Sequence, residues 1–197
     1  GAETGYLPPI PIGAGLTGTI LGRALESRHP HFAAGDLLIG RGSIGEVSLI
    51  VPDGLCWKVE PLPGESLSIA LGVLGIPGLT AYFGLMEVGR PKVGETVLVS
   101  GAAGTVGSLA GQIARLKGFR AIGIAGGETK RRKLIEEYGF DAAVDYKGRS
   151  VAELSAAIRE VCPAGVDVFF DNVGGTVLDA ALAQMNPGGR VAACGMI

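Results

Sequence analysis

An apolar strand pattern that runs directly into glycine-spaced residues and then a helix is the feature that most constrains this chain. The predicted strand covers residues 96–100 and the turn residues 101–107, after which Leu109, Ile113 and Leu116 recur at helical spacing. Small residues let a backbone approach a pyrophosphate closely, and a helix N-terminus presents free N–H groups and the positive end of its dipole. The pattern therefore predicts a dinucleotide-binding turn.

The spacing of the glycines departs from the usual G-x-G-x-x-G fingerprint. Gly101, Gly104 and Gly107 are present, but Ala102 stands where the second glycine would be. Taken alone, the cluster is also compatible with an ordinary tight turn between a strand and a helix. Further strand–helix units downstream favour the dinucleotide site.

Strand and helix patterns alternate from residue 93 onward. Strands are predicted at residues 96–100, 120–125, 142–145, 166–170 and 190–194, and helices at 107–117, 129–138, 150–161 and 176–185. Gly139 is expected to end the second helix, and Ser150 with Glu153 forms a capping box for the third. Residues 186–189 are expected to form a turn that leads into the last strand. The order predicts an α/β fold, a Rossmann-type doubly wound parallel sheet whose last, sixth strand is missing.

The first part of the chain has a different pattern. Residues 1–65 are expected to form part of a β-rich domain, with short strands at 14–25, 35–40, 46–51 and 55–59. Residues 66–86 carry no charge, but glycines and Pro77 interrupt them, so two buried helices with a break at Pro77-Gly78 are predicted rather than a membrane span. The predicted division is residues 1–65, connecting helices at 66–92, and a dinucleotide-binding domain at 93–197.

Composition excludes several classes of function. A net charge of −2 gives no basis for binding nucleic acid or an anionic membrane. Cys56, Cys162 and Cys194 are scattered, and only two histidines occur, so neither a zinc site nor a disulfide framework is expected. A reducing compartment, the cytoplasm, follows from this cysteine usage. Both ends of the chain look cut from a longer protein.

The residues after the second strand favour NADP over NAD. That strand ends in Ala125 and Gly126 without the acidic residue that usually accepts the ribose 2′-OH of NAD, and cations follow it. Lys130 is expected to attract the 2′-phosphate, whereas Arg132 and Lys133 are expected on a solvated helix face. Glu128 argues mildly the other way.

Other strand ends leave alternatives open. Tyr146 could pack against the adenosine ribose or phosphate, or could cap the core. Asn172 could hydrogen-bond near the nicotinamide, or form a local Asx-turn. Cys194 is not expected to be a nucleophile, because no histidine accompanies it.

Several linked motifs resemble the zinc-independent medium-chain dehydrogenases/reductases. They are GIPGLTAYFGL at 75–85, AAGTVG at 102–107, GQIA at 111–114, DYK at 145–147 and FDNVGG at 170–175. The branch with prostaglandin reductase (leukotriene B4 12-hydroxydehydrogenase), plant double-bond reductases and bacterial curcumin reductase is the most similar. In this family an alanine-containing turn replaces the glycine-rich fingerprint, which accounts for Ala102. The resemblance implies that residues 1–65 belong to a GroES-like domain.

The resemblance also implies a set of site residues. NADP(H) would be held by the turn residues Ala102, Ala103, Gly104, Thr105, Val106 and Gly107. Lys130 and Tyr146 would lie near the 2′-phosphate and Asn172 near the nicotinamide, while Cys194 and Gly195 would begin the next cofactor-contacting loop. Tyr6 stands where relatives have a substrate-pocket tyrosine, although a surface aromatic fits it equally well.

The activity implied by the resemblance is NADPH-dependent reduction of the C=C bond of an α,β-unsaturated ketone or aldehyde. Hydride would add to the β-carbon, no metal would take part, and a homodimer is expected. The family's proposed proton donor, a tyrosine, would lie beyond Ile197, so no catalytic residue is assigned. An NADPH-dependent quinone oxidoreductase and a non-catalytic NADPH-binding sensor remain as alternatives.

Overall fold

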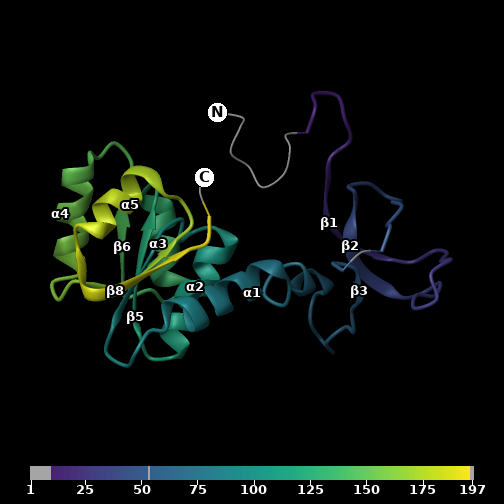
Figure 1. Cartoon of the computed structure of the whole chain (residues 1–197), viewed down its shortest axis with the longest axis horizontal. Coiled ribbons are helices and arrows are strands. Elements are labelled where there is room, and N and C mark those ends of the chain that lie inside the picture. The colour runs from purple at the N-terminus through teal and green to yellow at the C-terminus, as the bar shows by residue number, and fades with distance from the viewer. Residues whose placement is uncertain (1–9, 53, 196–197) are drawn as a thin grey trace. The chain divides into compact units, whose positions relative to one another are not determined.

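The computed structural model describes residues 10–52 and 54–195, and it divides the chain into two compact units (Figure 1). The first unit extends to Leu71 and the second begins at Gly72. Each unit contains a sheet of its own.

The first unit is built on a three-stranded antiparallel sheet in the order β1-β2-β3. The strands are β1 (Thr17–Arg23), β2 (Leu37–Ser43) and β3 (Trp57–Lys58), and a 3₁₀ helix, η1 (Leu67–Ala70), follows them. The apolar start of β2 supplies the buried residues Leu37, Leu38 and Ile39. The strand predicted at residues 46–51 is wrong. Its apolar side chains are largely exposed, so no packing stabilises an extended pairing there.

The prediction of a helix break at Pro77-Gly78 is also wrong. A helix, α1 (Ile76–Phe83), begins at that point and continues into the π-helical turn η2 (Gly84–Gly89). Pro77 lies in the first turn, where its missing N–H costs no helical hydrogen bond. Gly78 is buried against the backbone of Val73, where a side chain has no room. Within the described residues, no helix is long and apolar enough to cross a membrane.

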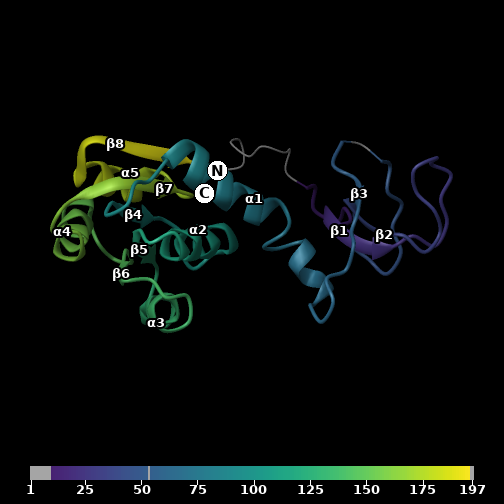
Figure 2. The same ribbon diagram turned by 90° about the horizontal axis from the view of Figure 1, so that it is seen from below.

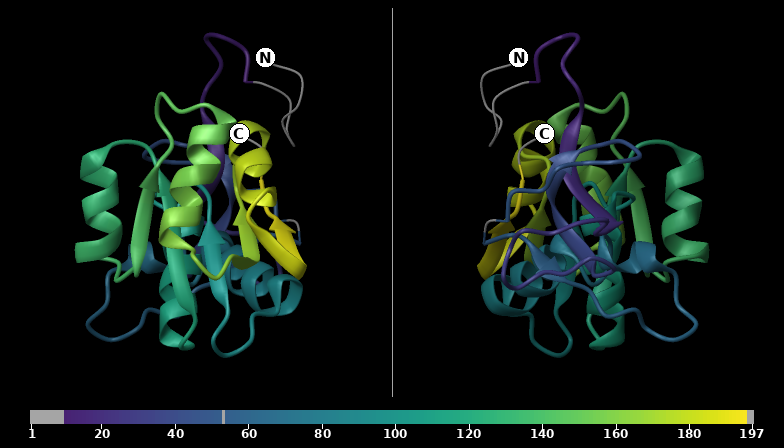
Figure 3. Two further views of the ribbon diagram at one scale, coloured as in Figure 1. Left: turned by 90° about the vertical axis from the view of Figure 1, so that its left-hand side faces the viewer. Right: turned by 90° about the vertical axis from the view of Figure 1, so that its right-hand side faces the viewer.

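The second unit contains the predicted parallel sheet. Its five strands have the order β6-β5-β4-β7-β8, and helices lie on both faces (Figure 2, Figure 3). The strands are β4 (Thr96–Val99), β5 (Arg120–Ala125), β6 (Ala142–Asp145), β7 (Val166–Asp171) and β8 (Met185–Ala193). Besides α1 and η2, the helices are α2 (Thr105–Leu116), α3 (Glu128–Glu136), α4 (Val151–Val161) and α5 (Gly175–Leu182). The prediction of a doubly wound α/β fold is thus confirmed.

The core of this unit has two halves, one on each face of the sheet. Neighbouring residues of β4 point to opposite faces, so that Val97 packs on the side of α1 and α2, whereas Leu98 packs on the side of α4 and α5. Strands covered on both sides read as continuous apolar runs, which is why the sequence pattern located them.

Local signals at the helix ends are confirmed, with one error near the C-terminus. Gly139 has a φ of +71°, and the Ser150 hydroxyl accepts from the Glu153 N–H while the Glu153 carboxylate accepts from the Ser150 N–H at 2.8 Å. The last helix, however, ends at Leu182, and residues 186–189 do not form a separate turn. They are an irregularity inside β8, since Met185 pairs with Val166 and Arg190 with Val168.

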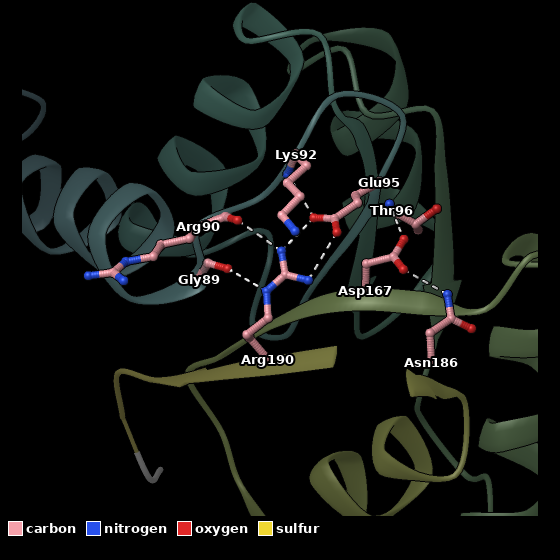
Figure 4. Close-up of polar contacts among 8 residues, drawn as sticks. All are labelled: Gly89, Arg90, Lys92, Glu95, Thr96, Asp167, Asn186 and Arg190. Carbon is pink, nitrogen blue, oxygen red and sulfur yellow. Dashed lines mark hydrogen bonds and ion pairs between the residues drawn. The ribbon is translucent and has the colours of Figure 1, made fainter. Parts of the chain in front are cut away.

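A polar cluster ties β8 to β4 at the amino ends of the strands (Figure 4). The guanidinium of Arg190 donates to both Glu95 carboxylate oxygens and to the carbonyls of Gly89 and Arg90. Beside it, the carboxylate of Asp167 accepts from the Thr96 N–H at 2.8 Å and from Asn186 Nδ2 at 2.8 Å. The cluster holds the edge strand β8 in place. It lies at the opposite edge of the sheet from the carboxyl ends of the strands.

Candidate functional site

The strand order reverses direction between β4 and β7. From β4 the chain passes to β5 and β6 on one side of the sheet, and then crosses to β7 and β8 on the other. In open parallel sheets, ligands bind outside the carboxyl ends of the strands at such a switch point. The residues that follow β4 and β7 in the sequence, Ser100 onward and Asn172 onward, therefore define the candidate site.

The glycine-spaced turn lies at the carboxyl end of β4. Gly101 has a φ of +55°, and the N–H of Gly104 donates to the Gly101 carbonyl at 2.9 Å, which closes the turn. Ala102 is fully buried, and its N–H donates to the Ile124 carbonyl. A side chain on Gly107 would lie 2.5 Å from the Gly101 carbonyl oxygen, so the turn fits directly against the first turn of α2 only because residue 107 is glycine.

The start of α2 can accept an anion. Gly104 is its N-cap and provides no side-chain cap. Within the described chain, the first-turn N–H groups of Thr105, Val106 and Gly107 consequently have no intrahelical acceptor. Such groups, together with the positive end of the helix dipole, form a binding site for phosphate. The predicted turn residues 102–107 lead directly into this helix start, and Gly104 and Thr105 are the exposed ones among them.

Asn172 is fixed against the end of β4 by a buried polar network. Its side-chain Nδ2 donates to the Ser100 carbonyl at 2.7 Å, and its backbone N–H donates to the Ser100 hydroxyl at 2.8 Å. That hydroxyl donates in turn to the carboxylate of Asp171 at 2.6 Å. Since Nδ2 is engaged by a carbonyl, the orientation of the amide is determined, and Oδ1 receives no hydrogen bond from the described residues.

The Asx-turn considered for Asn172 is made by Asp171 instead. The Asp171 carboxylate accepts from the N–H groups of Val173 and Gly174 at 3.0 and 3.1 Å. The residue is buried, with a relative exposure of 2%. The sequence analysis missed both Asp171 and Ser100. The signal that could have found them is a polar residue at the end of each of two otherwise apolar strands.

Four consecutive cations lie at residues 130–133 of α3, the helix that follows β5, and three of them are ion-paired. Arg131 pairs with Glu128 at 2.8 Å, Arg132 with Glu136 at 3.2 Å and Lys133 with Glu137 at 3.7 Å. Lys130 is exposed and forms no hydrogen bond or ion pair with any described residue. It is thus the cation of this group that can meet a ligand without first losing a partner.

The end of β6 lies directly beside this segment. Oδ1 of Asp145 accepts from the N–H groups of Gly127 and Lys147 at 2.9 and 3.0 Å, and these two bonds hold the pKa of the carboxyl below its ordinary value. A side chain on Gly126 would lie 3.1 Å from the ring of Tyr146. The ring is 43% exposed and is absent from both core clusters of described residues, so Tyr146 does not cap the core.

The end of β8 joins the site on the other side. The N–H groups of Cys194 and Gly195 donate to the Asp171 carbonyl at 2.8 and 3.2 Å. Burial raises the pKa of the Cys194 thiol, which disfavours the thiolate that a nucleophile needs. Tyr6, the predicted substrate residue, lies outside the described residues.

The structure thus groups the predicted residues into two neighbouring sets. The turn, Asn172, Cys194 and Gly195 gather at the ends of β4, β7 and β8, and Lys130 and Tyr146 at the ends of β5 and β6. In the described part of the chain, no group of three or more His, Cys, Asp or Glu side chains could hold a metal ion.

Comparison with known proteins adds to this geometry. Residues 105–197 match the family model described as zinc-binding dehydrogenase. The chain is 41% identical to the NADPH-dependent curcumin reductase of Escherichia coli (strain K12), over 99% of this chain and 55% of that protein. It is 43% identical to the 2-alkenal reductase (NADP(+)-dependent) of Nicotiana tabacum, over 99% of this chain and 56% of that protein. The chain belongs to the zinc-independent medium-chain dehydrogenases/reductases.

A solved structure of this family has the same fold. The crystal structure of CurA in complex with NADPH from Vibrio vulnificus aligns with a TM-score of 0.84 at 38% identity, over the whole of this chain and 57% of that one. The chain therefore spans a little over half the length of the relatives that it matches. The family predicted from the sequence motifs is confirmed.

Proposed function

We propose that this medium-chain dehydrogenase/reductase binds NADPH and reduces the C=C bond of α,β-unsaturated ketones or aldehydes without zinc. The observation that carries the proposal is the convergence, at one edge of the sheet, of an uncapped helix N-terminus with the fixed amide of Asn172. The curcumin and 2-alkenal reductases among its relatives support the cofactor and the substrate class.

The described residues fit the parts of an NADP cofactor. The turn residues Ala102, Ala103, Gly104, Thr105, Val106 and Gly107 would form a cradle for a pyrophosphate, because the N–H groups of residues 105–107 have no intrahelical acceptor and Gly107 leaves no side chain in the way. Lys130 supplies an uncommitted positive charge for the 2′-phosphate, and the exposed ring of Tyr146 follows the neighbouring strand, close to Gly126.

Asn172 is assigned to the nicotinamide side. Its Oδ1 is the acceptor that the Ser100 network leaves available, so it can orient a donor group of the cofactor. The backbone of Cys194 and Gly195 lies next to the Asn172 strand end and would line the same side.

When bound, NADPH supplies the hydride that adds to the β-carbon of the substrate. The contribution of this chain is to hold the cofactor in one orientation, which removes part of the entropic cost of bringing the reactants together. We assign no proton donor among the described residues. Tyr6 remains a proposed substrate-binding residue.

For the whole protein we propose a homodimer in the cytoplasm. In the domain division that we propose, residues 1–65 belong to a GroES-like substrate domain, 66–92 connect, and 93–197 bind the dinucleotide. Sedimentation of the purified protein tests the dimer, and a monomer at micromolar concentration would contradict it.

Steady-state oxidation of NADPH with a panel of acceptors tests the activity. We expect turnover with enones and enals and none with the matched saturated ketones. Turnover with quinones alone would indicate a quinone oxidoreductase and overturn the alkene assignment. Tight NADPH binding without turnover on any acceptor would instead indicate a sensor.

A further inference from the structure

Two carboxylates lie at the strand ends that we assign to the 2′-phosphate. Glu128 is the first residue of α3, and Asp145 is the last residue of β6, hydrogen-bonded to Gly127 directly before that helix. Like charges repel, and a 2′-phosphate carries close to two negative charges at neutral pH. With Lys130 and Lys147 as the only counter-charges, this site would be a poor one for NADPH.

Arg131 is placed to compensate both carboxylates. Its NH1 donates to the Glu128 carboxylate at 2.8 Å, and its Nε donates to the Ala143 carbonyl in β6 at 3.2 Å. The second contact holds the guanidinium over the strand that ends in Asp145. Its charge is one of the causes that lower the pKa of the Asp145 carboxyl, after the two backbone hydrogen bonds of that group.

The same geometry keeps Glu128 away from the role it could play in an NAD site. A carboxylate after the second strand normally accepts the ribose 2′-OH of NAD. Here that carboxylate is bound to a cation one helical turn further along α3. Arg131 therefore removes the acceptor that would favour NAD and cancels the charge that would oppose NADP.

We propose that Arg131 is a specificity-determining residue that sets the preference for NADPH over NADH by neutralising Glu128 and Asp145, an inference that rests on the proposed function. In this proposal Lys130 contacts the 2′-phosphate and Arg131 does not. The effect of Arg131 on the NADPH preference is therefore separate from the contact made by Lys130.

The neighbouring Arg132 provides a matched control. It is also an arginine on α3 that pairs with a glutamate of the same helix, but its partner Glu136 is the last residue of α3, about two turns further along the helix than Glu128. Substitution of either arginine changes the net charge of the protein equally. Only Arg131 also contacts β6.

The experiment compares dissociation constants for NADPH and NADH in Arg131→Met, Arg132→Met and the unmodified protein, by fluorescence titration at low salt. We expect Arg131→Met to lower the preference for NADPH about fivefold, which corresponds to about 1 kcal/mol. Arg132→Met should leave it unchanged. Adding Glu128→Gln to Arg131→Met should restore most of the preference, because the uncompensated carboxylate is then gone.

The outcomes separate the two proposals. If the unmodified protein binds both dinucleotides equally or binds neither, the proposed function fails. If it prefers NADPH and Arg131→Met keeps that preference, the role of Arg131 is wrong while the proposed function stands. Should Arg131→Met not fold, Glu128→Gln alone decides, since it leaves the Arg131 charge unpaired and should raise the preference about twofold. An unchanged preference in Glu128→Gln would overturn the inference.

Discussion

The side-chain amide of Asn172 donates to the backbone carbonyl of Ser100 at 2.7 Å, so the residues that follow β7 and β4 are bound to each other across the switch point. The Ser100 hydroxyl strengthens this link, since it accepts from the Asn172 N–H and donates to the buried Asp171 carboxylate. One serine therefore fixes both the position and the orientation of the amide that we assign to the nicotinamide side.

Ser100→Ala should weaken NADPH binding as well as the fold. The substitution leaves the Asn172 N–H without its acceptor and the Asp171 carboxylate with one donor fewer, which should lower the free energy of unfolding by about 1–3 kcal/mol. We expect the dissociation constant for NADPH to rise about tenfold, a loss of about 1.4 kcal/mol. Chemical denaturation and fluorescence titration measure the two effects.

Ser155→Ala is the control for this variant. Ser155 is also buried, and its hydroxyl accepts from Gln184 Nε2 at 2.6 Å, but it lies in α4 and not at the strand ends. It should lose stability without losing NADPH affinity. Equal weakening of NADPH binding in both variants would show that the Ser100 effect is a general one on stability.

Gly107→Ala should strongly weaken NADPH binding. The added methyl group would lie 2.5 Å from the Gly101 carbonyl oxygen and 2.8 Å from the Ala102 Cα, and both are backbone atoms of the turn. The turn must therefore move away from α2, and we expect the dissociation constant to rise at least about 30-fold, or about 2 kcal/mol. Titration with NADPH at a temperature where the variant is folded provides the measurement.

Gly111→Ala separates crowding in α2 from damage to the turn. A methyl group at Gly111 would enter the space of the Phe140 ring in the core. Overpacking of this kind should destabilise the protein by about 1–3 kcal/mol, but the folded fraction should bind NADPH normally. Normal affinity in Gly107→Ala would contradict the assignment of the turn.

The parallel sheet could be predicted because its signals are local. A strand buried on both faces, such as β4 or β7, reads as an apolar run, and Gly139 and the capping box at Ser150 mark helix ends by chemistry confined to a few residues. The error at residues 186–189 has a different origin. Pro187 and its glycines have the composition of a turn, but Asn186 Nδ2 bonds to Ala164 and Asp167, about twenty positions away, and the segment becomes an irregular part of β8.

The candidate site also has parts that neighbouring residues predict and parts that depend on distant residues. Lys130 and the turn could be named from neighbouring residues alone, whereas the role of Ser100 depends on Asp171 and Asn172, which are 71 and 72 positions away in the sequence. The sequence favours Lys130 among four adjacent cations after β5, but the ion pairs that glutamates form with the other three are known only from the structure.

The Glu95–Arg190 pair should make the stability of the second unit fall in acid. The hydrogen bond from Arg190 holds the pKa of the Glu95 carboxyl below its ordinary value, so the unfolded chain takes up a proton at higher pH than the folded one. The stabilisation is complete above the unfolded pKa of about 4.3 and is lost as the pH falls through the lowered folded value. Denaturation in urea at pH 7 and pH 3 measures it.

Glu95→Gln tests this prediction directly. It should cost about 1–2 kcal/mol at pH 7, because Arg190 keeps its contacts to Gly89 and Arg90 but loses a charged acceptor, and it should flatten the pH dependence in acid. Glu136→Gln is the control, since it removes an exposed pair within α3 and should leave the acid dependence unchanged. An unaltered acid dependence in Glu95→Gln would rule out the pair as its source.

Cys162 should resist alkylation in the native protein. Its side chain is 2% exposed at the end of α4, and burial raises the pKa of the thiol to about 11. Because the thiolate is the reactive form, about one molecule in a thousand would be competent at pH 8 even with full access. Iodoacetamide labelling followed by mass spectrometry should find Cys162 unmodified in the folded protein and alkylated in urea. Labelling of native Cys162 at the rate seen in urea would show that α4 opens on the timescale of the reaction.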